Sequence, residues 1–248
     1  MPADTLIFVI PVYQPDAALL PLLRELTAAT DHPVLLVDDG SSPVFHPLFE
    51  AARQIPSVRL LRHEKNRGKG AALRTAFAWI AENHPEISGI VTADADGQHA
   101  VADILAIGRA IIADPAAIHL GSRAFNGAGV PLKSRLGNLP MRLIFRLFTG
   151  RKIADTQTGL RGIPAELAAW LTTLPGDRYE FELAVLIAAP QLGYPLREHP
   201  IRVIYHRNNR GSHFHPLRDS LRVFAALFRR HKTVISDAGM HTRRVPRG

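Results

Sequence analysis

The sequence predicts an α/β protein with one domain, built on a mostly parallel central sheet that helices cover on both faces. Short, continuous apolar runs alternate with stretches of helical spacing, which is typical of a buried parallel sheet. The chain has 248 residues, of which 46% are hydrophobic, enough for one full core. Polar loops follow three of the apolar runs. Because ligands of such sheets gather outside the carboxyl ends of the strands, we expect these loops to form one site.

The alternation is clearest in the first half of the chain. The expected strands are residues 6–12, 33–37, 58–61, 87–93 and 118–121. The expected helices between them are residues 17–29, 71–81 and 102–113. After Arg123 the alternation stops, and we expect a polar turn from 155, a helix over 179–192, a strand over 196–205 and a helix over 219–230.

Two acidic residues close the fourth apolar run, in the segment Asp94-Ala95-Asp96-Gly97-Gln98-His99. Like charges this close repel unless a cation lies between them or one takes up a proton. Asp94 and Asp96, with Gln98 as a neutral oxygen donor, suit Mg²⁺ or Mn²⁺. The alternative for an isolated Asp-x-Asp is a turn that caps the next helix.

Two further loops carry polar groups. Asp38 and Asp39 end the second run, where a carboxylate can accept two sugar hydroxyls or a base N–H, although a turn explains one of the two equally well. The segment 66–70 holds Gly68, Lys69 and Gly70, which allow close approach of the backbone to an anion at a helix N-terminus.

Composition and charge exclude some classes. The chain has no cysteine, which excludes disulfides and thiolate metal sites. No stretch approaches the roughly 20 apolar residues that span a bilayer. Net charge is +8, and residues 197–248 hold twelve Lys and Arg against three acids, so the rest of the chain is at −1. A basic quarter suggests phosphate-bearing ligands or an anionic membrane, and no base-reading motif supports nucleic acid.

Taken together, the loops resemble glycosyltransferase family 2. The segments that carry the resemblance are 10–13 (IPVY), 37–41 (VDDGS), 66–72 (NRGKGAA), 94–99 (DADGQH) and 121–123 (GSR). Within the family the chain is most similar to the dolichol-phosphate mannose synthase group and its bacterial polyprenyl-phosphate relatives. The segment 155–161 resembles their Asp-x-Gln-x-Gly-x-Arg element.

This resemblance implies a GT-A fold and inverting transfer from a nucleotide-diphosphate sugar with Mg²⁺ or Mn²⁺. It implies a domain over 1–235, with the nucleotide-sugar half about 1–123 and the acceptor half about 124–235, and a basic tail over 236–248. The implied roles are metal binding for Asp94, Asp96 and Gln98, with Asp96 also counted as catalytic. The implied donor-binding residues are Pro11, Tyr13, Asp39, Lys69, Asp94 and Arg123, and the implied acceptor or phosphate-binding residues are Arg135, Gln157, Arg210 and His213.

Asp155 is the residue we expect at the acceptor. If the acceptor is a hydroxyl, Asp155 can take its proton as a general base. If the acceptor is a phosphate, it is already ionised, and Asp155 would position groups or pair with a basic residue. Glu180 and Glu182 form a second acidic pair, of which at most one can face the site from a helix. Relatives often carry a further Glu where this chain has Ala184.

Two basic amphipathic stretches, 141–148 and 221–232, have the profile of helices that lie in a headgroup layer. They could equally cover the sheet or a homodimer interface. We therefore expect a cytoplasmic enzyme on the inner face of the cell membrane, acting on a lipid acceptor, most readily a polyprenyl phosphate. The alternatives are transfer to a hydroxyl of another lipid or glycan and, outside this class, a nucleotidyltransferase. The latter usually has a Gly-rich loop after the first strand, which is absent here.

Overall fold

The computed structural model describes residues 4–123, 141–143 and 145–202. Its centre is one seven-stranded sheet in the order β3-β2-β1-β4-β6-β5-β7. The strands are β1 (Leu6–Val12), β2 (Val34–Asp38), β3 (Val58–Arg62), β4 (Gly89–Thr92), β5 (Ile118–Arg123), β6 (Arg161–Pro164) and β7 (Leu196–Ile201). All pairings are parallel except those of β6, which runs antiparallel to β4 and β5. The mostly parallel sheet predicted from the sequence is confirmed.

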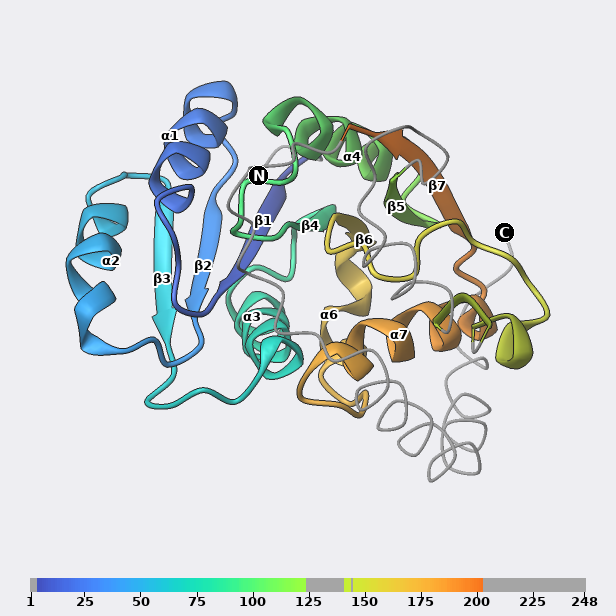
Figure 1. Cartoon of the computed structure of the whole chain (residues 1–248). Helices are drawn as coiled ribbons and strands as arrows, with labels where there is room; N and C mark the ends of the chain where they lie inside the picture. Colours follow the sequence, from blue (N-terminus) through green and yellow to red (C-terminus); the bar gives the residue numbers. More distant parts are fainter. Residues whose placement is uncertain (1–3, 124–140, 144, 203–248) are drawn as a thin grey trace.

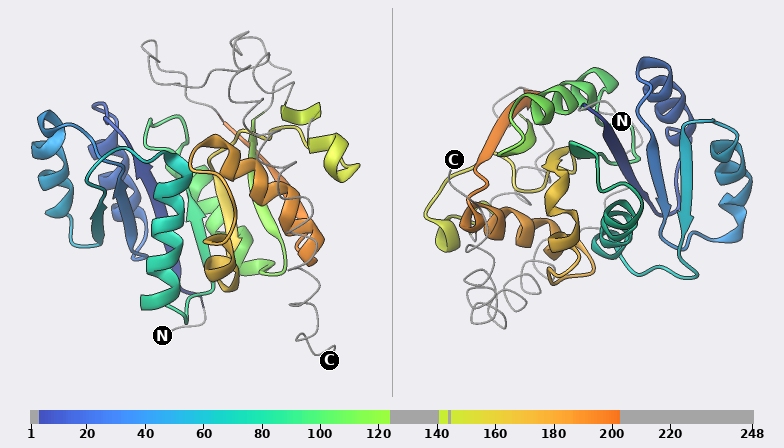
Figure 2. Two further views of the ribbon diagram at one scale, coloured as in Figure 1. Left: turned by 90° about the horizontal axis from the view of Figure 1, so that it is seen from below. Right: turned by 180° about the vertical axis from the view of Figure 1, so that it is seen from behind.

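Helices cover both faces of the sheet, as expected from strands without polar alternation (Figure 1 and Figure 2). The longer helices are α1 (Leu19–Ala29), α2 (His46–Arg53), α3 (Lys69–Asn83), α4 (Val101–Ala113) and α7 (Tyr179–Ala188), with the short α6 (Ala168–Leu171). Short 3-10 turns cover Pro43–Phe45, Ala165–Leu167 and Ala189–Leu192. One face packs on α1, α2 and α4, and the other on α3, α6 and α7.

The two faces of each strand supply the two cores. In β1, Phe8 and Ile10 belong to the core under α1 and α4, whereas Ile7 and Val9 belong to the core under α3 and α7. The alternation follows from the period of two along a strand. A strand buried on both faces must be apolar throughout, which explains the continuous apolar runs in the sequence.

The elements differ from expectation mainly in their bounds and in two short helices, α2 and α6, which were not expected. The helix expected over 71–81 is α3 and begins at Lys69, and the helix expected over 179–192 ends at Ala188 and continues as a 3-10 turn. α2 was not predicted; Phe49 and Ala52 bury one side of this short helix. β7 ends at Ile201, and the expected helix over 219–230, the stretch 221–232 and the tail 236–248 lie outside the described residues.

Candidate active site

The loops at the carboxyl ends of β2, β3 and β4 lie at one edge of the sheet. β6 begins at that edge, because Arg161 pairs with Thr92 at the end of β4, and Arg123 ends β5 there. The hydroxyl of Thr92 donates to the carbonyl of Gly159 at 2.7 Å, which ties the end of β4 to the segment 155–161. The predicted gathering of polar loops is therefore present, and β6 adds a fourth segment to it.

Asp39 holds the loop that follows β3. Its carboxylate accepts hydrogen bonds from the backbone N–H groups of Arg67 and Gly68 at 2.9 and 2.7 Å, and from the Asn66 amide at 3.1 Å. Its Oδ1 also lies 2.7 Å from Nδ1 of His63. These four contacts match the capacity of a carboxylate. Its part in this structure is thus to shape the segment 66–68, and the contact with a nucleotide stays a prediction.

The residues after β1 lie beside this loop. Pro11 is buried in β1 opposite Val37, and the Asp39 N–H donates to the carbonyl of Val12 at 2.8 Å. Tyr13, in contrast, has 40% of its surface exposed. An exposed aromatic ring at the carboxyl edge of the sheet is free to stack on a planar ligand group.

Lys69 and Asp94 form the centre of the candidate site. The Lys69 ammonium lies 2.6 Å from Oδ1 of Asp94 and 2.9 Å from Oε1 of Glu182. Burial by itself lowers the pKa of Lys69, but the carboxylates of Asp94 and Glu182 outweigh burial and raise it. Burial likewise raises the pKa of Asp94, while Lys69 and His99 outweigh burial and hold it well below the usual value. Lys69 and Asp94 therefore both carry their charge at neutral pH.

Glu180 and Glu182 form the second acidic pair, and the structure separates the two members. Glu182 is 7% exposed and faces Lys69 from the first turn of α7. Glu180 accepts a hydrogen bond from the Asp177 N–H at 3.2 Å, outside that contact. This agrees with the expectation that at most one of the two faces the site.

Arg161 is buried next to Glu182 and was not assigned a role from the sequence. It is 2% exposed; its Nε donates to the carbonyl of Thr158 at 3.0 Å and its Nη1 to the carbonyl of Glu182 at 2.7 Å. Burial lowers its pKa, while Glu182, Asp155 and Asp94 all act in the other direction. The last residue of the motif 155–161 is thus a buried positive charge that acts electrostatically on Glu182, Asp155 and Asp94.

Asp96 and Gln98 form a tight turn after Asp94. The Gln98 N–H donates to Oδ1 of Asp96 at 3.0 Å, and Gly97 has φ +69°, a conformation that favours glycine. Burial, followed by repulsion from Asp94, raises the pKa of Asp96. The turn considered as an alternative is therefore present, but no side chain caps α4, which begins five residues after Asp96.

The donor set at this turn fits a divalent cation that arrives with a diphosphate. Two carboxylates in mutual repulsion and one amide oxygen supply hard ligands, and Mg²⁺ usually takes one or two carboxylates with substrate phosphates. Within the described ranges no three acidic or histidine side chains converge as a complete ligand cage. Among the described residues, the buried Nδ1 of His99 has no hydrogen-bond partner, and its Nε2 lies 3.6 Å from Oδ2 of Asp94.

Asp155 and Arg123 form a second charged pair. Asp155 is fully buried; Nε and Nη2 of Arg123 approach its two oxygens at 2.5 and 3.0 Å, and the Gln157 N–H donates to it at 3.0 Å. Glu198 in β7 holds the residues that precede both partners, because its Oε1 accepts from the Ser122 hydroxyl and the Ala154 N–H, each at 2.8 Å.

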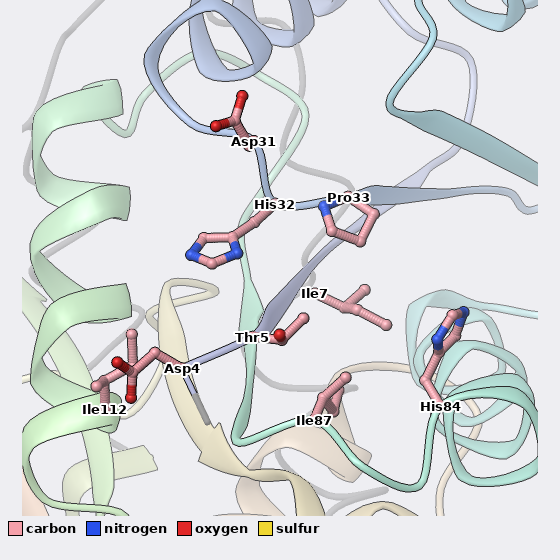
Figure 3. A pocket seen from close by; sticks show the side chains of 9 residues that line it. All are labelled: Asp4, Thr5, Ile7, Asp31, His32, Pro33, His84, Ile87 and Ile112. Atoms are coloured by element: carbon pink, nitrogen blue, oxygen red, sulfur yellow. The ribbon is translucent and has the colours of Figure 1, made fainter. Parts of the chain in front are cut away.

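Three predicted acceptor residues, Arg135, Arg210 and His213, lie outside the described residues. A pocket of about 470 Å³ opens at the opposite, amino-terminal end of the sheet, where His32 and His84 flank Ile7 and Ile87 (Figure 3). It contains none of the predicted site residues, so we do not assign the activity to it.

The chain matches the model of glycosyl transferase family 2 over residues 7–168. It is 32% identical to UDP-N-acetylglucosamine–dolichyl-phosphate N-acetylglucosaminyltransferase of Methanococcus voltae, covering 82% of this chain and 87% of that protein. It is 27% identical to undecaprenyl-phosphate mannosyltransferase of Micrococcus luteus, covering 79% and 82%.

Among solved structures, glucosyl-3-phosphoglycerate synthase of Mycobacterium tuberculosis, in complex with Mn²⁺, UDP-glucose and phosphoglyceric acid, is similar in fold. Its TM-score is 0.66 at 18% identity, covering 92% of this chain and 79% of that chain. The fold, the loops at the carboxyl edge and the match over most of the chain lead to one conclusion. The chain belongs to glycosyltransferase family 2, and it is a glycosyltransferase with a GT-A fold.

Proposed function

We propose that this protein is a metal-dependent, inverting glycosyltransferase that transfers a sugar from a nucleotide-diphosphate sugar to a polyprenyl phosphate. The observation that carries the acceptor assignment is the buried pair of Asp155 and Arg123, in which both carboxylate oxygens are engaged by one guanidinium. The Methanococcus and Micrococcus relatives are named for dolichyl phosphate and undecaprenyl phosphate, and these names support the same class of acceptor.

On the donor side, Asp94, Asp96 and Gln98 would hold Mg²⁺ or Mn²⁺ against the diphosphate. The metal would supply charge stabilisation where negative charge develops on the leaving nucleoside diphosphate. Tyr13 and the loop that Asp39 shapes would receive the nucleoside. Lys69 provides a further positive charge at the same edge of the sheet.

On the acceptor side, a phosphate oxygen would attack the anomeric carbon, and the bond to the diphosphate would break on the opposite face of the sugar. A phosphate is already ionised at neutral pH, so this attack requires no general base. That suits Asp155, whose oxygens already accept from Arg123 and from the Gln157 N–H. Asp155 would then fix the guanidinium of Arg123 beside the incoming phosphate. Gln157, Arg135, Arg210 and His213 are the further phosphate-binding residues that we propose.

We also propose that the protein associates peripherally with an anionic membrane on its cytoplasmic side. In the part of the chain that the structure describes, no helix is long and apolar enough to cross a bilayer. Residues 141–143 and 145–149 are helical and bury Met141 and Phe145, whereas Leu143 and Leu147 are 58% and 69% exposed. The exposed Arg142 and Arg146 accompany them. Exposed leucines beside arginines suit a headgroup layer, where each basic residue adds about 1 kcal/mol on anionic lipid.

Flotation with phosphatidylglycerol vesicles tests the membrane proposal. The protein should float at low salt, and the double variant Leu143→Ser/Leu147→Ser should float less while keeping its thermal stability, because neither side chain is buried. A wild-type protein that stays at the bottom would overturn it.

Transfer of radiolabelled sugar tests the enzymatic proposal. With Mn²⁺, a panel of nucleotide sugars and a polyprenyl phosphate, at least one donor should give a labelled lipid. Asp155→Asn should lower this transfer without abolishing it. If label instead enters a lipid or glycan bearing only hydroxyl groups, and Asp155→Asn abolishes that transfer, the phosphate acceptor is wrong.

A further inference from the structure

The Lys69 ammonium lies between two carboxylates, one of which is the first expected metal ligand. It contacts Asp94 at 2.6 Å and Glu182 at 2.9 Å, and its side chain is only 21% exposed. Lys69 is the first residue of α3, while Glu182 comes from α7, 113 residues later in the chain. Two separate helices therefore bring opposite charges to the end of β4.

A divalent cation and this ammonium compete for Asp94. Two positive charges on one carboxylate repel strongly in a partly buried site. Asp94 also has little room to turn away, since the Cα of Gly159 lies against it: a Cβ there would meet Oδ2 of Asp94 at 2.3 Å. Metal binding at Asp94 therefore favours the departure of Lys69 rather than movement of the carboxylate.

We propose that Lys69 is an exchangeable counterion, which neutralises Asp94 before substrate binds and moves to the diphosphate, still tethered by Glu182, when the metal arrives. This inference rests on the proposed function. Lys69 thus has one role before the substrate binds, as the counterion of Asp94, and another afterwards, at the diphosphate. Glu182 is a positioning residue for Lys69.

The surroundings of Glu182 suit a fixed tether. Glu182 is 9% exposed at its side chain, and the guanidinium of Arg161 binds its backbone carbonyl at 2.7 Å. Nη2 of Arg161 lies 4.0 Å from Oε1 of Glu182 and has no hydrogen-bond partner among the described residues. When Lys69 moves, Arg161 remains as a positive charge behind Glu182.

The exchange predicts opposite effects of one substitution on two affinities. Lys69→Met frees Asp94, so binding of Mn²⁺ alone, measured by electron paramagnetic resonance, should tighten on the order of tenfold. The same variant loses a cation for the diphosphate, so binding of UDP or GDP at saturating Mn²⁺, measured by calorimetry, should weaken on the order of tenfold. Lys65→Met is the matched control: Lys65 is exposed in the loop that precedes α3 and carries the same charge, and both affinities should stay within about twofold.

Glu182→Gln tests the tether. Lys69 then keeps Asp94 as its only charged partner in the triad, so binding of Mn²⁺ alone should weaken several-fold. Circular dichroism checks folding, and Lys69→Gln replaces Lys69→Met if the latter does not fold.

The outcomes separate this inference from the function on which it rests. If the wild type binds neither Mn²⁺ nor a nucleoside diphosphate with Mn²⁺, both the proposed function and the exchange of Lys69 are wrong. If the wild type binds the nucleotide with Mn²⁺ but Lys69→Met does not bind Mn²⁺ more tightly, only the exchange is wrong. An unchanged Mn²⁺ affinity in Glu182→Gln overturns the tether.

Discussion

Asp155→Asn should destabilise the folded protein, because it breaks a buried ion pair from one side. Asp155 is fully buried and Arg123 keeps 19% of its side chain exposed. An asparagine retains one oxygen but presents an NH₂ group to the guanidinium, so one strong hydrogen bond is lost and the charge of Arg123 loses the carboxylate that faces it. Removing one partner of a fully buried pair costs about 3–5 kcal/mol, and the partial exposure of Arg123 lowers this to about 3 kcal/mol.

Urea unfolding of the wild type and the variant at pH 7 measures this loss directly. For a chain of this size, about 3 kcal/mol corresponds to a fall in Tm of roughly 6–12 °C. Asp177→Asn is the control, because it makes the same chemical change in a pair with Arg74 whose carboxylate is 67% exposed. It should cost at most about 1 kcal/mol. A loss in Asp155→Asn no greater than in Asp177→Asn would refute our account of the buried pair.

Three further predictions concern other positions. Glu198→Ala removes the carboxylate that accepts hydrogen bonds from Ser122 and Ala154, and should lower kcat/KM for the acceptor substrate about fivefold. Glu198→Gln keeps an oxygen and should retain most of the activity. Equal losses in both variants would argue against a positioning role for Glu198. Gly159→Ala should abolish Mn²⁺-dependent nucleotide binding in a folded protein, because its Cβ would meet the Asp94 carboxylate at 2.3 Å; retained affinity in calorimetry would contradict this. Partial burial and the nearby His119 lower the pKa of His199 below 6.5, so as pH falls the unfolded chain takes up a proton at this position before the folded chain does. The contribution of neutral His199 to the free energy of unfolding is therefore complete above pH 6.5 and is lost as pH falls through the lowered pKa. Unfolding at pH 7.5 and 5.5 should show a smaller difference in His199→Gln than in the wild type, and an equal difference would exclude this source.

Much of the fold and the place of the site could be predicted from the sequence. Continuous apolar runs imply strands buried on both faces, and parallel strands bring their carboxyl ends to one edge. The loops that contain Asp39, Lys69 and Asp94 were therefore expected to lie together at that edge of the sheet. The fold that the resemblance implied is confirmed by the sheet and by the similar solved structure.

The sequence could not show which charges pair. Lys69 and Glu182 are 113 residues apart, and their contact depends on how α3 and α7 pack over the sheet. In the sequence, Arg161 was only the last residue of a motif. Its position near Glu182 depends on β6, which lies between β4 and β5 and runs antiparallel to both. Neither the place of a four-residue strand in the sheet nor its direction can be read from the sequence.

Asp39 illustrates a different limit. Its place after β2 could be predicted, whereas its contact with a nucleotide stays a prediction. That its carboxylate already accepts from His63, Asn66 and two backbone N–H groups depends on the path of the loop after β3. A sequence motif therefore predicts the ligand contacts of a side chain only where its partners in the fold leave its polar atoms free.

The most direct test of the central claim is thermal unfolding of the protein with a panel of nucleotide-diphosphate sugars, with and without Mn²⁺. We predict that at least one nucleotide sugar raises the Tm only when Mn²⁺ is present, and that the double variant Asp94→Asn/Asp96→Asn loses this increase. If no nucleotide sugar stabilises the protein in a metal-dependent way, the assignment of Asp94 and Asp96 to a metal-bound diphosphate is contradicted.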